Sequence, residues 1–285
     1  MRKYNPLGVS ATLIVLCLWS VSGLAQTMPL RFGVFPHLST RVLLEVYQPL
    51  ADHLSQALNR PVTLETAPDF ADFLTRTREG RYDLLFTPPH LAYLAQSETG
   101  YRPLYAYTSP LYGLLVVRKH APYQSLRDLK GKPLAMADPL GIVVMMMEAE
   151  LSRAGLRQGR DFTRIEARSH NNAALLVIQG KAQGAVMGTM AFQRLPAQIR
   201  QDLRPLVHTR PILSPVYLAN SKLPAAEVVA LKAALKGFAA TAPGHEFFKQ
   251  GGLGDLLPVS AAQLQEFGEY GREAARRLKR RRVAP

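Results

Sequence analysis

Apolar residues in the first hundred positions follow two different periods in turn. Short apolar runs of strand length occupy residues 30–35 and recur in "PVTLETA" and "YDLLFTP". Between the first two runs, residues 43–58 repeat apolar side chains near a 3.6-residue period, at Leu43, Val46, Leu50, Leu54 and Leu58. That period is typical of an amphipathic helix. Asp69 is a predicted N-cap for a helix closed by Gly80, and Pro89 stands in the first turn of another. Three strand–helix alternations predict a parallel sheet covered on both faces.

The same alternation starts again at residues 112–119 and continues through "PLAMAD", "FTRIEAR" and "AQGAVMG". The last part of the chain holds too few strand signals for a third sheet, so we expect it to complete the first unit. The pattern predicts an α/β fold of two lobes, with two parallel or mixed sheets flanked by helices. The hinge is expected at two crossings, near 108–113 and 207–214. Lobe 1 is expected at 28–110 and 211–285, ending in a basic helix, and lobe 2 at 111–210.

The N-terminus has the features of a signal peptide, which we place at residues 1–25. Arg2 and Lys3 precede an apolar run at 13–21 that is too short for a membrane span of about 20 residues. Small residues at Gly23 and Ala25 fit a cleavage site. Cleavage removes the chain's one cysteine, so the mature protein has no disulfide, thiol nucleophile or cysteine metal site.

The formal net charge of +14 is unevenly distributed. Residues 112–210 hold 15 Lys/Arg against 7 Asp/Glu, whereas residues 28–111 hold 7 against 8. A solvated arginine-rich surface is one interpretation, and attraction of anions is the other. Nucleic acid is not an expected partner, because the chain carries an export signal and no reading motif. We expect the basic end, "REAARRLKRRR", to be a solvated terminus rather than a contact with acidic lipid headgroups.

Motifs for catalysis are missing from the sequence. It has no Gly-x-Ser-x-Gly elbow, His-Glu-x-x-His helix, phosphate-binding Walker loop or dinucleotide-binding glycine motif. We therefore predict that the protein is not an enzyme, has no catalytic residues and uses no cofactor. Methionines gather near the second-lobe strand ends, at Met136, Met145, Met146, Met147, Met187 and Met190. Thioethers can bind copper(I), but core filling is the favoured interpretation, and we predict no metal.

Several segments resemble the periplasmic phosphate/phosphite/phosphonate-binding proteins of ABC importers. They are "FGVFP", the Tyr-x-Pro-Leu-Ala-x-x-Leu run from Tyr47, "YDLLFTPP", "SLRDLKGKPLAMADP" and "SHNNAALLVIQGKAQGAV". The resemblance implies a type II periplasmic binding protein, a monomer that closes two lobes on a small anionic ligand. It also implies a periplasmic location and delivery to an ABC permease in the inner membrane. A sensor that presents the same clamp to a membrane histidine kinase stays open as an alternative.

The family's anion-binding loop is altered in this sequence. In the family, hydroxyl-bearing residues follow the Asp-Pro turn, but here the matching positions are Gly141, Ile142, Val143 and Val144. We expect Gly141, Ile142 and Val143 to bind the ligand through backbone N–H groups at a helix N-terminus. Each hydrogen bond lost to a charged ligand forfeits about 1.5–3 kcal/mol. The sequence therefore predicts weaker phosphonate binding or a less charged ligand.

Five further residues are candidate ligand contacts. His170 matches the family's phosphate-contacting histidine, and Tyr47 and Tyr93 lie near positions where relatives use tyrosine. Thr87 and His90 flank a strand-to-helix turn that faces the expected cleft. A structural role is the competing interpretation for each histidine. The family's acidic residues for a ligand amine have no obvious counterparts, which disfavours an aminophosphonate.

Overall fold

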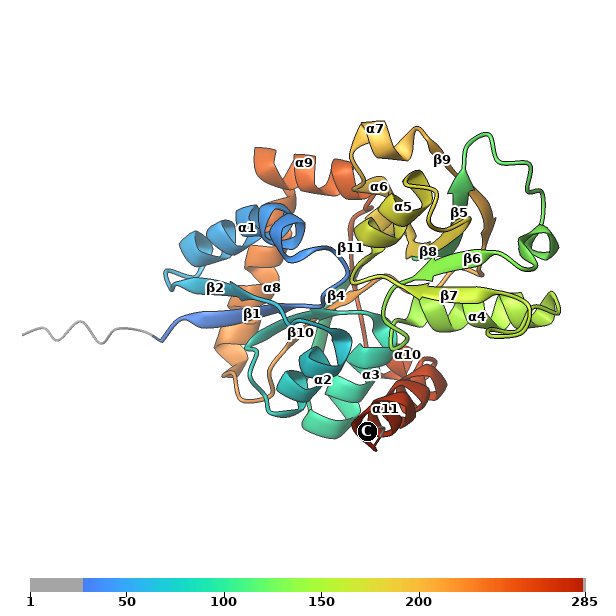
Figure 1. Cartoon of the computed structure of the whole chain (residues 1–285). Coiled ribbons are helices and arrows are strands. Elements are labelled where there is room, and N and C mark those ends of the chain that lie inside the picture. Colours follow the sequence, from blue (N-terminus) through green and yellow to red (C-terminus); the bar gives the residue numbers. More distant parts are fainter. Residues whose placement is uncertain (1–27, 284–285) are drawn as a thin grey trace, which may run out of the picture.

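Residues 28–283 are described by the computed structural model, which contains two sheets, one in each lobe (Figure 1). The six-stranded sheet has the order β11-β4-β10-β3-β1-β2. Its strands are β1 (Leu30–Val34), β2 (Val62–Glu65), β3 (Leu84–Thr87), β4 (Arg102–Tyr107), β10 (Val216–Ala219) and β11 (Leu256–Pro258). The five-stranded sheet has the order β7-β6-β8-β5-β9. Its strands are β5 (Gly113–Arg118), β6 (Pro133–Met136), β7 (Thr163–Glu166), β8 (Gly184–Gly188) and β9 (Leu203–His208).

Helices flank both sheets (Figure 1). Those of the first lobe are α1 (Thr40–Ala57), α2 (Phe70–Arg78), α3 (Pro89–Thr99), α8 (Ala225–Ala239), α9 (Ala242–Gly251), α10 (Ala261–Gln265) and α11 (Gly268–Val283). Those of the second are the 3₁₀-helix η1 (Leu126–Leu129), α4 (Ile142–Arg153), α5 (His170–Ile178), α6 (Thr189–Gln193) and α7 (Ala197–Arg200). The predicted two-lobed α/β fold with flanking helices is confirmed.

The start and stop signals at α2 act as the sequence predicts. The Asp69 carboxylate accepts a hydrogen bond from the Asp72 backbone N–H at 2.8 Å, which satisfies one of the free donors of the first turn. The helix ends at Arg78, and Gly80 adopts a left-handed backbone with φ of +68°. Glycine carries no Cβ and takes that conformation at little cost.

The first sheet is mixed, which agrees with the predicted parallel or mixed sheets. β1 runs parallel to β2 and β3, but β10 lies antiparallel between β3 and β4. β10 and β11 come from the last quarter of the chain, which re-enters this sheet after building the second one. β4 and β9 had not been recognised as strands, because each contains a proline, Pro103 or Pro205, that interrupts the apolar pattern.

Two crossing segments join the lobes and lie side by side. The backbone N–H of Leu111 donates to the Ile212 carbonyl at 2.9 Å, and the Ile212 N–H returns a bond to the Leu111 carbonyl at 3.0 Å. The predicted signal peptide at 1–25 lies outside the described residues. Within residues 28–283, no helix is both long and apolar enough to cross a membrane.

Candidate functional site

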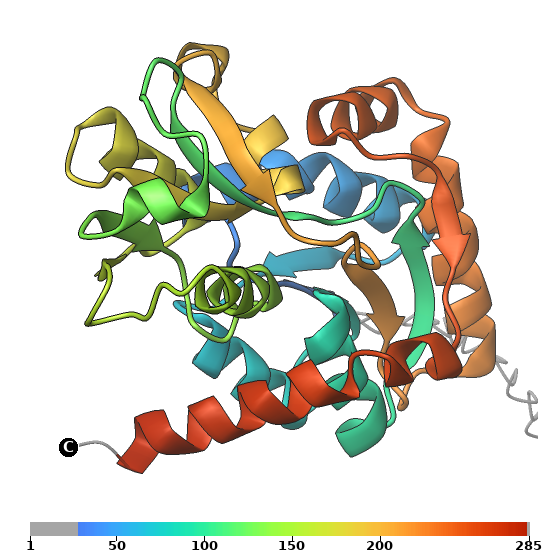
Figure 2. The ribbon, with the colours of Figure 1, turned by 90° about the vertical axis from the view of Figure 1, so that its right-hand side faces the viewer.

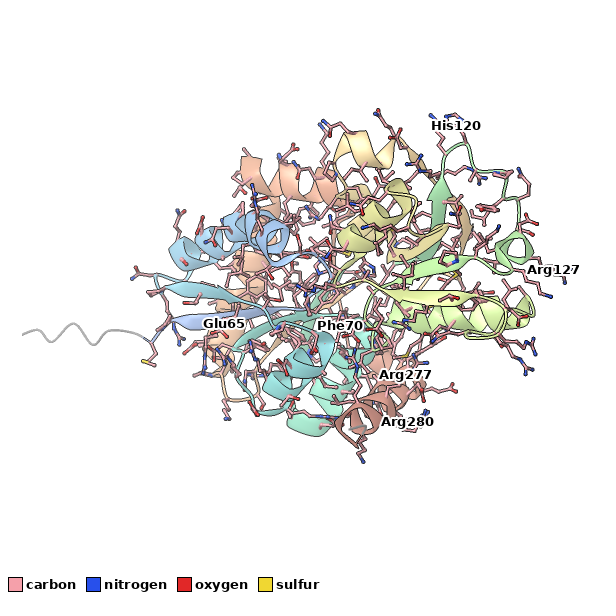
Figure 3. The ribbon with its side chains drawn as sticks, in the orientation of Figure 1. Glu65, Phe70, His120, Arg127, Arg277 and Arg280 are labelled. Atoms are coloured by element: carbon pink, nitrogen blue, oxygen red, sulfur yellow. The ribbon has the colours of Figure 1, made fainter. Side chains whose placement is uncertain are left out.

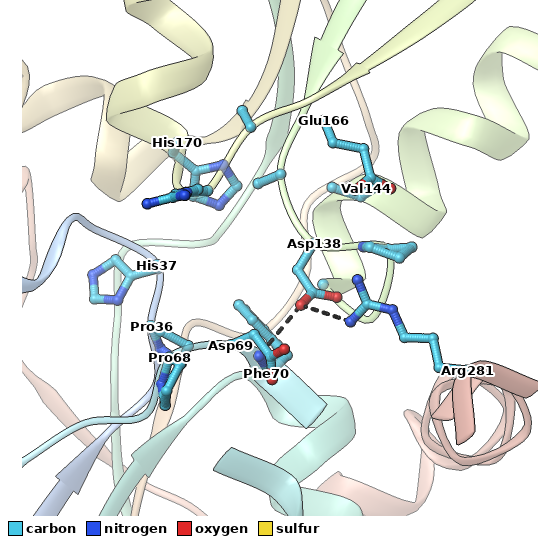
Figure 4. Close-up of a pocket in the computed structure, with 15 residues that line it drawn as sticks. Pro36, His37, Pro68, Asp69, Phe70, Asp138, Val144, Glu166, His170 and Arg281 are labelled. Carbon is cyan, nitrogen blue, oxygen red and sulfur yellow. Dashed lines mark hydrogen bonds and ion pairs between the residues drawn. The ribbon is translucent and has the colours of Figure 1, made fainter. Parts of the chain in front are cut away.

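A cleft of about 490 Å³ opens between the lobes, beyond the carboxyl ends of strands from both sheets (Figure 4). That edge is where open α/β sheets place their ligands. From the first lobe it is lined by residues after β1, at the start of α2 and in α11: Pro36, His37, Pro68, Asp69, Phe70 and Arg281. From the second lobe it is lined by the β6–α4 and β7–α5 connections: Ala137, Asp138, Pro139, Gly141, Val144, Glu166, Ala167, Arg168 and His170.

His170 is the first residue of α5 and faces this cleft (Figure 4). Ser169 before it caps the helix by accepting the Asn172 N–H at 3.3 Å. His170 is only 6% exposed, and its Nδ1 has no hydrogen-bond partner in the described part of the chain. Burial lowers the pKa of His170 to about 4, against a backbone hydrogen bond to Val186 that raises it. The ring is therefore neutral at pH 7.

His37 lines the opposite wall, and its tautomer follows from its partners. Nδ1 lies 2.9 Å from the Phe35 carbonyl oxygen, which only accepts, so Nδ1 carries the proton. Nε2 then accepts from the Tyr47 hydroxyl at 3.5 Å. Burial lowers the pKa of His37 to about 3. Tyr47 is fully buried, does not line the cleft and contacts it only through His37.

The turn between β6 and α4 carries a carboxylate that bridges the lobes. Asp138 Oδ1 accepts the Leu140 N–H at 2.9 Å within the turn. Its Oδ2 accepts the Phe70 N–H at 3.3 Å, at the N-terminus of α2, and lies 3.3 Å from Arg281 Nη1 (Figure 4). Asp138 thus occupies a position between a helix N-terminus and a guanidinium, both of which favour a negative charge.

The altered loop divides between two hollows. Gly141 lines the main cleft, whereas Ile142 and Val143 line a smaller apolar hollow of about 30 Å³ that Gly141 and His170 also border. Gly141 is the N-cap of α4, and its own N–H donates to the Asp138 carbonyl oxygen at 3.0 Å, so the N–H groups of Ile142 and Val143 are the ones without a partner within the helix. The loop consequently offers backbone donors beside an apolar surface.

The other candidates lie behind the cleft and do not line it. His90 is buried, its Nε2–H donates to the Leu140 carbonyl at 2.7 Å, and burial lowers its pKa to about 4. Thr87 is also buried, and its hydroxyl has no partner among the described residues. The Tyr93 hydroxyl faces α11, 3.5 Å from Arg272 Nη1. His90 therefore supports the turn that shapes the cleft.

Residues 32–264 match the family of ABC transporter, phosphonate, periplasmic substrate-binding proteins. The chain belongs to this family. The resemblance seen in the sequence is thereby confirmed, and with it a solute-binding role in transport.

Solved structures share the fold of this phosphonate-transporter binding protein. A binding protein component of an ABC phosphonate transporter from Pseudomonas aeruginosa has 16% sequence identity and a TM-score of 0.73, and the match covers 89% of this chain and 99% of that chain. The PhnD1 protein of Prochlorococcus marinus, in complex with methylphosphonate, has 17% identity and a TM-score of 0.76, covering 86% and 97%. A histidine kinase sensor domain with similarity to periplasmic binding proteins has 15% identity and a TM-score of 0.53, covering 81% and 99%.

Several cleft residues of this binding protein had not been singled out from the sequence. Glu166 is the last residue of β7 and Arg168 follows it, so both stand at a strand end where a search for polar residues finds them. Arg281 gives no such signal, because it lies in α11, beyond the residues that match the family. The clustered methionines are buried in the core. Within residues 28–283, no group of three or more His, Cys, Asp and Glu is placed to hold a metal ion.

Proposed function

We propose that this protein is exported and captures a small oxyanion of the phosphonate, phosphite or phosphate type in the interlobe cleft, for delivery to an ABC permease. The observation that carries the proposal is His170. A buried polar atom without a partner is costly, and His170 Nδ1 is such an atom in the wall of a cleft between two lobes. A ligand P–OH group that donates a hydrogen bond to this nitrogen removes that cost.

The surrounding helices favour the same chemistry. α4 and α5 both begin at the cleft, and the positive ends of their dipoles attract a negative group. The one proton of the neutral His170 ring is used on the Val186 backbone carbonyl, so the unpartnered Nδ1 accepts a hydrogen bond from the P–OH group of a singly protonated oxyanion. The loop at Gly141 supplies amides and no hydroxyls. We therefore expect binding weaker than a hydroxyl-rich loop would give, by about 1.5–3 kcal/mol for each missing bond.

A sensing role is the second candidate, supported by the likeness to a histidine kinase sensor domain. Capture of the ligand is the same in both roles, so binding data do not separate them. Uptake of the bound anion into membrane vesicles containing a partner permease and ATPase supports transport. Stimulation of a partner kinase without uptake supports sensing.

Calorimetry with methylphosphonate, phosphite and phosphate tests the proposal. We expect wild-type protein to bind at least one of them, and His170→Ala to weaken that binding about tenfold or more, which corresponds to the loss of one hydrogen bond to a charged group. His120→Ala is the control, because His120 is exposed and lines no part of the cleft (Figure 3). Absence of binding to all three anions, or equal affinities for both variants, would overturn the assignment.

A further inference from the structure

We infer that Arg281, supplied by the C-terminal helix α11, is an anion-binding residue of the cleft. It provides the strong donor that the loop after Asp138 lacks. The inference rests on the proposed function, because it concerns how the same cleft holds an oxyanion. The residue lies outside positions 32–264, so membership of the family does not supply it.

α11 is held firmly against the first lobe, which fixes where its arginines lie. Gly271 allows a close approach to α3, because a Cβ at this position would be 2.7 Å from Tyr93 Cδ1 and 2.9 Å from the His90 carbonyl oxygen. From that contact the helix passes beneath α4, which is seen nearly end-on in Figure 2. Arg277 Nη1 then donates to the Pro139 carbonyl oxygen and to Glu148 Oε2, both at 2.9 Å.

Arg281 follows Arg277 by four residues, and residues four apart share one face of a helix. The contacts of Arg277 with the second lobe therefore point Arg281 toward the cleft, where its guanidinium lies opposite Asp138 (Figure 4). The side chain is 40% exposed, so it is accessible to a ligand that enters the cleft. A guanidinium has five N–H donors, and Arg281 uses one of them on the Asp138 carboxylate.

The charges around the cleft make this arginine important for an anion. Asp69, Asp138 and Glu166 line it with negative charge, whereas Arg168 and Arg281 are its lining cations and the histidines are neutral. Removing Arg281 leaves one lining cation against three carboxylates. Asp138 itself holds the place that a ligand oxyanion would take between the Phe70 N–H and Arg281. We expect a bound anion to compete with Asp138 for these donors.

Matched arginine variants in α11 test the role of Arg281. Calorimetry with methylphosphonate is expected to show at least fivefold weaker binding for Arg281→Gln, and intermediate weakening for Arg281→Lys, which keeps the charge but loses the planar fork. Arg280→Gln is the control, because Arg280 is exposed on the same helix and does not line the cleft (Figure 3). We expect its affinity to stay within twofold of wild type, and thermal melting checks that both variants fold.

Asp138→Asn gives a second, independent measurement. This variant removes the competing carboxylate, so we expect it to bind methylphosphonate at least threefold more tightly than wild type. The double variant with Arg281→Gln should lose this gain, because the released donor is Arg281. Equal affinities for Arg281→Gln and Arg280→Gln would overturn the inference and leave the proposed function in place. Failure of wild type to bind methylphosphonate, phosphite and phosphate would overturn both.

Discussion

His37, His90 and His170 meet around the turn that joins β6 to α4, and each is uncharged for the same reason. All three side chains are buried, and desolvation lowers the pKa to about 3 for His37 and to about 4 for His90 and His170. Their tasks nevertheless differ. His37 accepts a hydrogen bond from the Tyr47 hydroxyl, and His90 donates one to the Leu140 carbonyl. His170 Nδ1 has no hydrogen-bond partner among the described residues. Burial thus keeps all three histidines neutral, whereas the hydrogen-bond partners of each ring decide what it does in the structure.

The stability of the folded protein should fall as the solution becomes acidic. Each of the three histidines has a folded pKa below the value of about 6.5 in the unfolded chain, so the unfolded state takes up protons first. The contribution is fully present above pH 6.5 and is lost as the pH falls toward 4. Between pH 6.5 and 5, each histidine accounts for a loss of up to about 2 kcal/mol in the free energy of unfolding.

Urea unfolding at pH 7.5 and pH 5 measures this loss. His90→Gln keeps a donor for the Leu140 carbonyl but cannot be protonated, so we expect it to recover about 1–2 kcal/mol of the decrease at pH 5. The exposed His120 provides the control, and His120→Gln should leave the decrease unchanged. An identical pH dependence in wild type and His90→Gln would contradict the explanation.

At the scale of elements, α11 ties the two lobes together through an ion-pair network. Glu148 of α4 lies 3.0 Å from Arg164 Nη1 and 2.9 Å from Arg277 Nη1. The Arg164 side chain is 8% exposed and the Glu148 side chain 22%, so solvent screens this network less than a surface pair. Glu273 adds a further bond to Arg277 at 2.9 Å within α11. The basic C-terminal segment is therefore a packed helix rather than a solvated terminus.

Two glutamates on α4 allow a direct comparison of a buried and an exposed pair. Glu148→Gln leaves the buried Arg164 without its acid partner, and we expect the free energy of unfolding to fall by about 1–3 kcal/mol. Glu150→Gln breaks the pair with Arg153, whose side chain is 68% exposed, and should cost less than about 1 kcal/mol. Urea unfolding at pH 7.5 distinguishes the two, and equal losses would show that the network adds nothing to stability.

At the scale of the whole molecule, hydrogen bonds link the two lobes directly across the cleft, whereas apolar side chains fill the interior of each lobe. The His170 N–H donates to the His37 carbonyl at 3.3 Å, and Asp138 accepts from Phe70, so a few polar bonds link the lobes across the cleft. The crossings at Leu111 and Ile212 provide the covalent connection. Single hydrogen bonds of this kind break at little cost, whereas the α11 network and the apolar residues shared by the two lobes are the contacts that a hinged opening has to rearrange.

Small-angle scattering tests closure of this clamp. We expect saturating methylphosphonate to reduce the radius of gyration, because a ligand that contacts both walls favours the closed arrangement. Arg280→Gln should compact in the same way, since it leaves the cleft intact. Identical scattering curves with and without bound ligand would show that the lobes do not move relative to one another.

The sequence by itself determined the two-lobed α/β fold class and the start and end of helices such as α2. These features depend on local periodicity and on start and stop residues such as Asp69 and Gly80, which act over a few positions. It also pointed to Gly141 and His170, because both stand at strand ends that a parallel sheet brings to one edge. The strands that contain Pro103 and Pro205 were missed, since each strand's pairing comes from distant segments and not from its own pattern.

Only the tertiary structure decided which of these residues line the cleft. Tyr47 is buried behind His37, and Arg281 arrives from a helix more than a hundred residues beyond Asp138. Side-chain burial and contacts between distant segments arise when whole elements pack, and no local pattern of residues records them. The sequence therefore predicted the unusual composition of the loop at Gly141. The position of Arg281 near this loop follows only from the tertiary structure.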